Sequence, residues 1–225
     1  MRVLLICDDH WHPGDVPTEG VKPLEGKGFE FDVVTDMIGF DYSTFSEYSV
    51  ILLCKSAEVK DSGREDWKSP AAGRAFVDFV EGGGGLLAVH SATVAGADSD
   101  ILDRLIGSRF TFHPERGPVL VQAVKPHPLT EGVEAFCEVD EHYKLEILSD
   151  DADIFLASYS ASQGEESKFA TEPYNNAPAC ICAAGYVRVQ GKGRVCVLTP
   201  GHLLPVWLDV NFQRLLENAL QWCGG

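Results

Sequence analysis

The first half of the chain alternates short apolar runs with segments whose apolar residues recur at helical spacing. The apolar runs cover residues 3–7, 31–35, 50–54 and 86–90, and each has the length of a β-strand. The run at 50–54 lacks polar alternation, which is typical of a strand covered on both faces. Residues 73–81 and the segment around 101–106 each present one apolar face, as amphipathic helices do. This alternation predicts a mostly parallel sheet with helices on both faces.

The second half of the chain predicts more strands and fewer helices. Strand-like runs lie at residues 119–124, 154–158 and 180–183, and two further runs at 186–189 and 194–198 flank the sequence Gln190-Gly191-Lys192-Gly193. Glycines at such a connection are typical of a β-hairpin. Residues 211–222 predict a closing amphipathic helix, and the polar stretch at 160–176 predicts a long loop. We find no linker or repeat, so the pattern indicates a single domain over residues 1–225.

Composition and charge narrow the functional classes. Hydrophobic residues make up 45% of the chain, which suffices for a sizeable core. No apolar run approaches the ~20 residues of a membrane span. The chain starts directly with a strand pattern, and its cysteines form no tight framework, so we expect a cytoplasmic protein with reduced thiols. The net charge of −16 disfavours nucleic acid and anionic membranes as partners.

Two local motifs have simpler interpretations than the cofactor sites that they suggest. The four glycines at 82–85 follow a helix and open a strand, whereas a dinucleotide-binding fingerprint follows a strand and opens a helix. We therefore expect a helix end and no nucleotide cofactor. Cys180 and Cys182 share one strand face, and Cys196 could approach them across the hairpin to form a zinc site. No CxxC pair supports that site, so packing is the favoured role.

Histidines and acids follow the ends of several predicted strands. His90 ends the run at 86–90, and His202 comes shortly after the run at 194–198. Because open α/β sheets bind ligands beyond the carboxyl ends of their strands, we expect these side chains to converge on one pocket. Imidazoles and carboxylates are the groups that proton transfer near neutral pH and divalent metal binding require.

This expectation assigns a candidate role to each residue. The candidate catalytic residues are His90, His113, Glu141 and His202. The candidate ligands of a divalent metal, which would be zinc, manganese or nickel, are His90, His113 and His202. The candidate substrate-binding residues are Asp9, His10, Trp11, Ser91 and Tyr143.

Ser91 leaves a different mechanism open. It stands where a nucleophile elbow would place its serine, but Val89 and Thr93 replace the flanking glycines of G-x-S-x-G. A serine hydrolase that uses Ser91 with His202 is therefore one alternative. A strand-end serine that satisfies backbone groups is the simpler interpretation.

Taken in order, several segments resemble the ThuA-like (trehalose utilisation) family. They are Asp9-His10-Trp11, Gly83-Gly84-Gly85-Leu86-Leu87 with His90-Ser91, Arg109-Phe110 with His113-Pro114, His127-Pro128, Asp140-Glu141-His142-Tyr143, Gly191-Lys192-Gly193-Arg194-Val195, Gly201-His202 and Asn218-Ala219-Leu220-Gln221-Trp222. The resemblance covers nearly the whole chain. It implies the α/β fold of class I glutamine amidotransferases, which is flavodoxin-like and would here carry an additional β-hairpin in its C-terminal half.

The resemblance to amidotransferases does not extend to their chemistry. Those enzymes have a cysteine at the elbow and a histidine–glutamate pair after a later strand. This chain has His90-Ser91-Ala92 at the first place, and Leu203-Leu204 follows His202 at the second. Glutamine hydrolysis would therefore lack its thiolate nucleophile. The resemblance implies a role in the utilisation of a disaccharide or sugar derivative.

Two functions from different classes follow. The first is a sugar-processing enzyme with a His/Glu site, with or without a divalent metal, and a small-molecule sugar as its partner. The second is a non-catalytic sugar-binding or regulatory module on a degenerate amidotransferase scaffold, since a fold does not dictate a function. The hairpin around Gly191 and the loop at 160–176 would serve either a homodimer or a cover for the pocket.

Overall fold

The computed structural model describes residues 1–57, 67–160 and 180–225, and the predicted loop at 160–176 lies almost entirely outside them. The elements, in which η marks a 3₁₀ turn, are β1 (Arg2–Cys7), α1 (Asp15–Glu25), β2 (Glu30–Val34), η1 (Tyr42–Glu47), β3 (Val50–Cys54), α2 (Pro70–Glu81), β4 (Gly85–Val89), η2 (His90–Thr93), α3 (Asp100–Ile106), β5 (Ser108–Phe112), β6 (Gly117–Ala123), η3 (Pro128–Thr130), β7 (Phe136–Asp140), β8 (Lys144–Ile147), β9 (Asp153–Ser160), β10 (Cys180–Gln190), β11 (Gly193–Leu198), α4 (Leu204–Leu208) and α5 (Val210–Cys223).

A nine-stranded sheet forms the centre of the molecule, in the order β2-β1-β3-β4-β11-β10-β9-β6-β7. The strands from β2 to β11 run parallel, and the rest extend the sheet with antiparallel pairs. Strands β5 and β8 pair separately. Every residue of β3 and β4 is buried, as expected for strands covered on both faces. The predicted α/β class with a flavodoxin-like sheet is confirmed.

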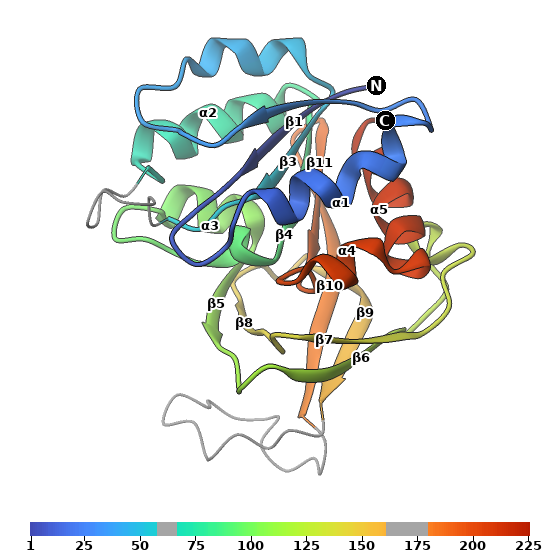
Figure 1. Cartoon of the computed structure of the whole chain (residues 1–225). Coiled ribbons are helices and arrows are strands. Elements are labelled where there is room, and N and C mark those ends of the chain that lie inside the picture. The colour runs from blue at the N-terminus through green and yellow to red at the C-terminus, as the bar shows by residue number, and fades with distance from the viewer. Residues whose placement is uncertain (58–66, 161–179) are drawn as a thin grey trace.

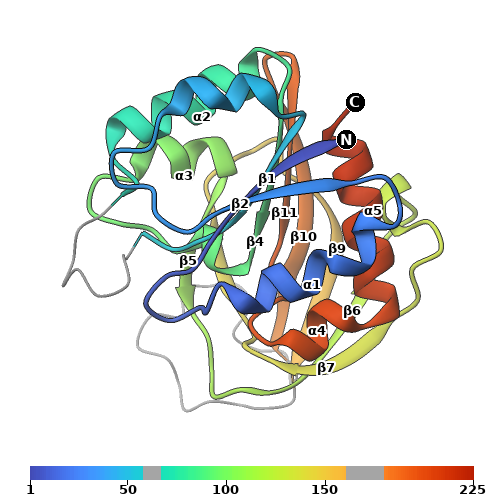
Figure 2. The same cartoon turned by 45° about the horizontal axis from the view of Figure 1, so that its top comes forward.

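Helices cover both faces of the sheet, as Figure 1 and Figure 2 show. On one face α1 and α5 contribute Leu24 and Leu216 to a hydrophobic cluster that includes Leu52 of β3. On the other face α2 and α3 contribute Phe76 and Leu102 to a second cluster. The sheet therefore holds a core on each side, and its polar loops are left at the ends of the strands. Within the described residues, no helix is long and apolar enough to cross a membrane.

The predicted hairpin is present, with one change in its first strand. The runs at 180–183 and 186–189 form a single strand, β10, with an irregular register at Gly185. It pairs with β11 in a register that places Gln190 opposite Gly193. Cys196 lies opposite Val187, and Cys182 pairs with Ser158 on the other side of β10, so the hairpin register does not place Cys182 and Cys196 opposite each other. Burial raises the pKa of Cys196 well above its usual value, which agrees with the packing role.

Candidate functional site

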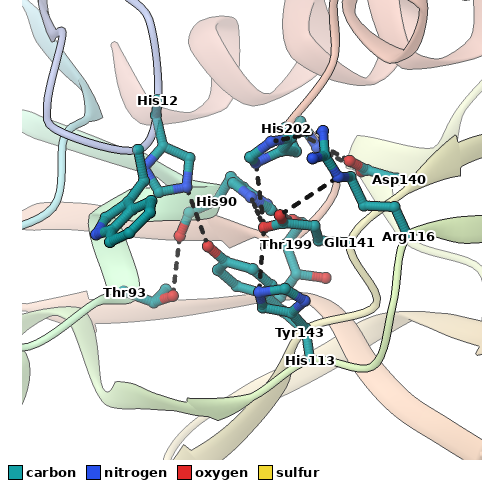
Figure 3. Close-up of polar contacts among 12 residues, drawn as sticks. His12, His90, Thr93, His113, Arg116, Asp140, Glu141, Tyr143, Thr199 and His202 are labelled. Atoms are coloured by element: carbon teal, nitrogen blue, oxygen red, sulfur yellow. Dashed lines mark hydrogen bonds and ion pairs between the residues drawn. The ribbon is translucent and has the colours of Figure 1, made fainter. Parts of the chain in front are cut away.

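Four polar side chains meet beyond the carboxyl ends of the parallel strands (Figure 3). His12 lies in the loop after β1, His90 directly follows β4, and His202 follows β11. Glu141 comes from the end of β7 in the antiparallel part of the sheet. One ligand atom from each of the four lies within 4.8 Å of the others. The structure thus brings together His90, Glu141 and His202, which the sequence singled out, and adds His12.

His90 occupies the sharp turn between β4 and η2. Its φ of 49° lies in the left-handed region, which non-glycine residues adopt at a cost of about 1–3 kcal/mol. Its Nδ1 lies 2.7 Å from the carbonyl oxygen of Thr199. A carbonyl only accepts, so Nδ1 carries a proton. Nε2 of His90 lies 3.4 Å from Oε2 of Glu141. The strained residue at this elbow is therefore His90, and the following Ser91 is buried.

Asp9 orients His12. Its Oδ1 accepts from the backbone N–H groups of Trp11 and His12 and from Nδ1 of His12, at 2.9, 3.1 and 2.7 Å. Burial alone would raise the pKa of Asp9, but these bonds lower it to about 2. The carboxylate is thus an acceptor, and His12 carries its proton on Nδ1. Burial lowers the pKa of His12, so the ring is neutral at pH 7. Its Nε2 lies 3.2 Å from the hydroxyl of Tyr143.

Glu141 is the shared acidic partner of these histidines. Its Oε2 lies 3.1 Å from Nδ1 of His202. Burial raises the pKa of Glu141, but the nearby imidazoles of His202 and His90 outweigh burial and hold the pKa well below its usual value. The neighbouring Asp140 fixes the loop that carries His202, because its carboxylate accepts from the backbone N–H groups of Gly201 and His202 at 2.8 and 3.0 Å.

Other side chains form the walls around this cluster. His113 places Nε2 3.6 Å from Glu141, and its Nδ1 donates to the carbonyl of Pro114 at 2.8 Å. The ring of Tyr143 stacks on His90 with centroids 3.9 Å apart. Burial raises the pKa of Tyr143 far above its usual value, so its hydroxyl keeps its proton. Arg116 also approaches Glu141, with 4.0 Å between Nε and Oε1.

A cavity of about 390 Å³ opens onto the cluster. It is lined by Trp11, His12, Val94, Phe110, His113, Arg116, Glu141, Tyr143 and His202. This volume lies in the usual range for small-molecule sites. The aromatic rings at its rim, including the largely exposed Trp11, offer apolar faces of the kind that sugar rings contact.

Some predicted residues lie beside this cavity. Asp9 is buried behind His12 and supports it. His10 is exposed and packs edge-on against Trp11 outside the lining. Ser91 lies beneath the histidines, where it lines a void of only about 10 Å³. The sequence interpretation missed the roles of His12 and Arg116. A signal for His12 exists, because it stands three residues after a carboxylate at a strand end.

A buried lysine holds the segment that follows His90. Lys68 is fully buried, and its ammonium group donates to the carbonyl oxygens of Ala92 and Val94 at 2.7 and 2.8 Å. Buried cations need such partners, because desolvation without them is costly. Lys68 thereby fixes η2 and places Val94 at the wall of the cavity.

The cluster fits the requirements of a divalent metal ion. Nε2 of His90 and Nδ1 of His202 are buried and have no hydrogen-bond partner among the described residues. His12 and His90 each donate their other ring nitrogen to an oxygen acceptor, as metal-bound histidines do. Three imidazoles and a carboxylate suit zinc and similar transition ions. The sequence predicted His90, His113 and His202 as ligands. The group in the structure keeps His90 and His202, leaves out His113, and includes His12 and Glu141.

Solved structures with the same architecture define the class of fold. A glutamine amidotransferase from Thermotoga maritima matches with a TM-score of 0.60 at 14% identity, over 100% of this chain and 98% of that one. A ThuA-like protein from Bacteroides uniformis gives 0.74 at 21% identity, over 99% and 91%. A Salmonella typhimurium protein described as cytoplasmic gives 0.67 at 17% identity, over 99% of both chains. No curated protein matches the chain.

The chain is thus an α/β protein with the glutamine amidotransferase-like fold. The family model described as ThuA, trehalose utilisation, matches residues 2–223. The chain therefore belongs to the ThuA family, as the sequence motifs indicated.

Proposed function

We propose that this chain is a divalent-metal-dependent enzyme that acts on a sugar or sugar derivative. One observation carries the proposal. Ring nitrogens of His12, His90 and His202 surround the carboxylate of Glu141 at one end of an open cavity. Burial of such a cluster costs free energy, because two of its buried nitrogen atoms make no hydrogen bond among the described residues.

The protein side of the mechanism follows from the hydrogen bonds. Nδ1 of His12 is paired with Asp9 and Nδ1 of His90 with the Thr199 carbonyl, so Nε2 of each ring is the atom that would ligate an ion. For His12 the ion would replace the present contact with the Tyr143 hydroxyl. Nδ1 of His202 and the carboxylate of Glu141 would complete the set of ligands. A divalent ion at this point would polarise a sugar oxygen and acidify a bound water molecule.

His113 is the residue we assign to proton transfer. It donates from Nδ1 to the carbonyl of Pro114, so Nε2 is the ring nitrogen left to exchange a proton with a ligand at the cavity wall. Its side chain is partly exposed, so a substrate in the cavity can reach it. A base or acid within hydrogen-bond reach of the reacting group is what general acid–base catalysis needs.

Sugar is the substrate class that the family description and the cavity both support. The family is described by trehalose utilisation. Trp11, Phe110 and Tyr143 provide ring faces around the cavity, and histidine and carboxylate groups provide hydrogen-bond partners for hydroxyls. The same features would serve a binding module without catalysis, which is the second candidate. It is favoured by the elbow, where a histidine stands in place of a nucleophile.

The first experiment measures metal content by plasma mass spectrometry on wild type and on His90→Ala, His202→Ala and His10→Ala variants. We expect close to one zinc, manganese or nickel ion per chain in wild type and in His10→Ala, whose exposed ring lies outside the cluster. His90→Ala and His202→Ala should lose the ion. A wild-type protein that remains metal-free after reconstitution with each ion would overturn the metal-dependent function.

A second measurement separates the enzyme from the binding module. The metal-loaded protein is incubated with disaccharides, monosaccharides and their oxidised derivatives, and products are followed by mass spectrometry. Conversion of any sugar that depends on His113 supports the enzyme. Binding by calorimetry with no conversion of any compound supports the module.

Cellular location and assembly belong to the same proposal. We place the enzyme in the cytoplasm, which is supported by the description of the Salmonella typhimurium relative. The homodimer remains a prediction that sedimentation of the purified chain can test.

A further inference from the structure

Arg116 is a cation at the wall of the cavity. It lies in the connection between β5 and β6, and its side chain is 54% exposed. The chain has 34 acidic residues against 18 lysines and arginines. Among the described residues that line the cavity, Arg116 is the one arginine or lysine. A positively charged side chain at the wall of this cavity would pair with a negatively charged group of a ligand.

The present partners of Arg116 hold it weakly. Its Nε lies 4.0 Å from Oε1 of Glu141, and its Nη1 lies 3.5 Å from Nε2 of His202. Good hydrogen bonds between charged groups are about 2.7–2.9 Å long. Both contacts are therefore loose, and the guanidinium can turn to a ligand without breaking a strong bond.

Metal binding, on which this inference rests through the proposed function, would loosen Arg116 further. If His202 ligates through Nδ1, its ring proton is on Nε2, and an N–H there cannot accept from Arg116. Glu141 would share its charge with the ion. The acids behind the cluster, Asp9 and Asp140, are already engaged by backbone N–H groups. The cavity would then carry an excess of positive charge that a neutral sugar leaves uncompensated.

We propose that the substrate is a sugar acid and that Arg116 binds its carboxylate. The planar guanidinium matches a carboxylate with two parallel N–H donors, and a charge-assisted bond of this kind is about twice as strong as a neutral one. Phosphate groups are typically cradled by backbone N–H groups at a helix N-terminus. An arginine pairs with either anion, but the described lining offers this one arginine and no lysine, so we assign the singly charged carboxylate. In this arrangement Trp11 and Phe110 contact the sugar ring, and Arg116 selects ligands that carry a negative charge.

The test is calorimetric titration of the full chain, with and without zinc. The ligands are D-glucuronate, D-gluconate, D-glucose and D-glucose 6-phosphate. The variants are Arg116→Gln, Arg116→Lys and the matched control Arg104→Gln, which removes an equal charge from the exposed face of α3. We expect wild type and Arg104→Gln to bind at least one of the two acids ~10–100-fold more tightly than glucose. Arg116→Gln should lose this preference, and Arg116→Lys should keep only part of it.

Metal content measured on the same samples separates the two proposals. Zinc retained by Arg116→Gln together with a lost acid preference supports the inference. Zinc-loaded wild type that binds both acids no better than glucose, or the phosphate best of all, overturns the sugar-acid assignment and leaves the metal site intact. Wild type that binds none of zinc, manganese and nickel on reconstitution overturns the metal-dependent function. In that case an acid preference that disappears in Arg116→Gln still supports the role of Arg116, and its absence overturns that role too.

Discussion

The two ends of the parallel strands carry hollows of different size and chemistry. The cavity at the carboxyl end measures about 390 Å³ and is lined by three of the four potential metal ligands. The hollow at the amino end measures about 720 Å³ and is lined by Tyr42, Ser43, Phe45, Ser46, Tyr48, Ser49, Ala75, Asp78, Phe79, Gly82, Gly83, Gly84 and Gly224. No imidazole is among the described residues of that lining. Chemistry, and not volume, distinguishes the candidate site.

The difference originates in how the chain enters and leaves the strands. At the amino end, α2 returns to β4 through a tight glycine turn, where a Cβ on Gly84 would lie 2.3 Å from the ring of Phe79. Small residues are needed there for packing. At the carboxyl end the chain leaves β1, β4 and β11 through polar segments that carry His12, His90 and His202. This agrees with the general location of ligands in open α/β sheets.

The sharpest test of the difference is His113→Ala at the carboxyl end. We expect kcat on the best sugar substrate to fall ~10²–10⁴-fold, because the variant removes a proton-transfer group. Metal content should stay unchanged, because His113 lies outside the group of ligands. Steady-state kinetics and plasma mass spectrometry check both outcomes. Unchanged kcat would remove His113 from the mechanism, and loss of metal would place it among the ligands.

The carboxyl end should also lose stability in acid. His142 is buried beside Ser158, with 3.0 Å between Nε2 and Oγ, and burial lowers its pKa to about 4. The unfolded value is about 6.5, so the unfolded chain binds more protons between these two pH values. Stability is therefore complete above pH 6.5 and declines as the pH falls towards 4, by about 3 kcal/mol.

Urea unfolding of the metal-free protein at pH 7 and pH 5 measures this decline. In His142→Gln the amide cannot take up a proton, so the difference in unfolding free energy between the two pH values should shrink. An equal difference in wild type and variant would show that His142 is not its source.

Asp9→Asn tests the support behind the ligands. Asp9 accepts from Nδ1 of His12 and from the backbone N–H of Ser56. Loss of its charge weakens the bond that orients His12, and such changes behind a metal ligand typically lower metal affinity ~10–100-fold. Competition with a chromophoric chelator measures the affinity. A wild-type affinity in the variant would mean that His12 is positioned without Asp9.

The smallest effect is expected at the amino end. Asp78→Asn changes a carboxylate of α2 in the lining of the larger hollow. This hollow lies at the opposite end of the parallel strands from the His/Glu cluster. We expect metal content and kcat to stay within about twofold of wild type, as for most surface substitutions. A loss of activity in this variant would contradict the functional difference between the two ends.

The sequence revealed the parallel strands and three of the four clustered residues because their signals are local. Strand 50–54 is a continuous apolar run, and His90 and His202 directly follow such runs. Strands β5, β7 and β8 and helix α1 were not predicted. β8 has only four residues, and α1 contains Pro23 and lacks a side-chain cap. Their formation depends on tertiary pairing that a single sequence does not show.

His12 shows what local patterns omit. The orientation of the His12 side chain depends on the loop after β1. In this loop Asp8 has a φ of 72° and its carboxylate accepts from the N–H of Gly14 at 2.9 Å. Neither the left-handed turn nor the bonds of Asp9 can be recognised from residue types alone. The same holds for Arg116, whose place at the cavity follows from the course of the chain between β5 and β6.

The chemical reactivity of the buried Lys68 amine depends on local opening of the segment that contains Ala92 and Val94. Reagents that acylate amines need a solvent-exposed, unprotonated nitrogen, and Lys68 is enclosed with its N–H groups bonded to Ala92 and Val94. Its modification therefore requires the segment behind His90 to come apart. The acylation rate of Lys68, compared with that of exposed lysines such as Lys22, therefore measures how often that segment opens locally.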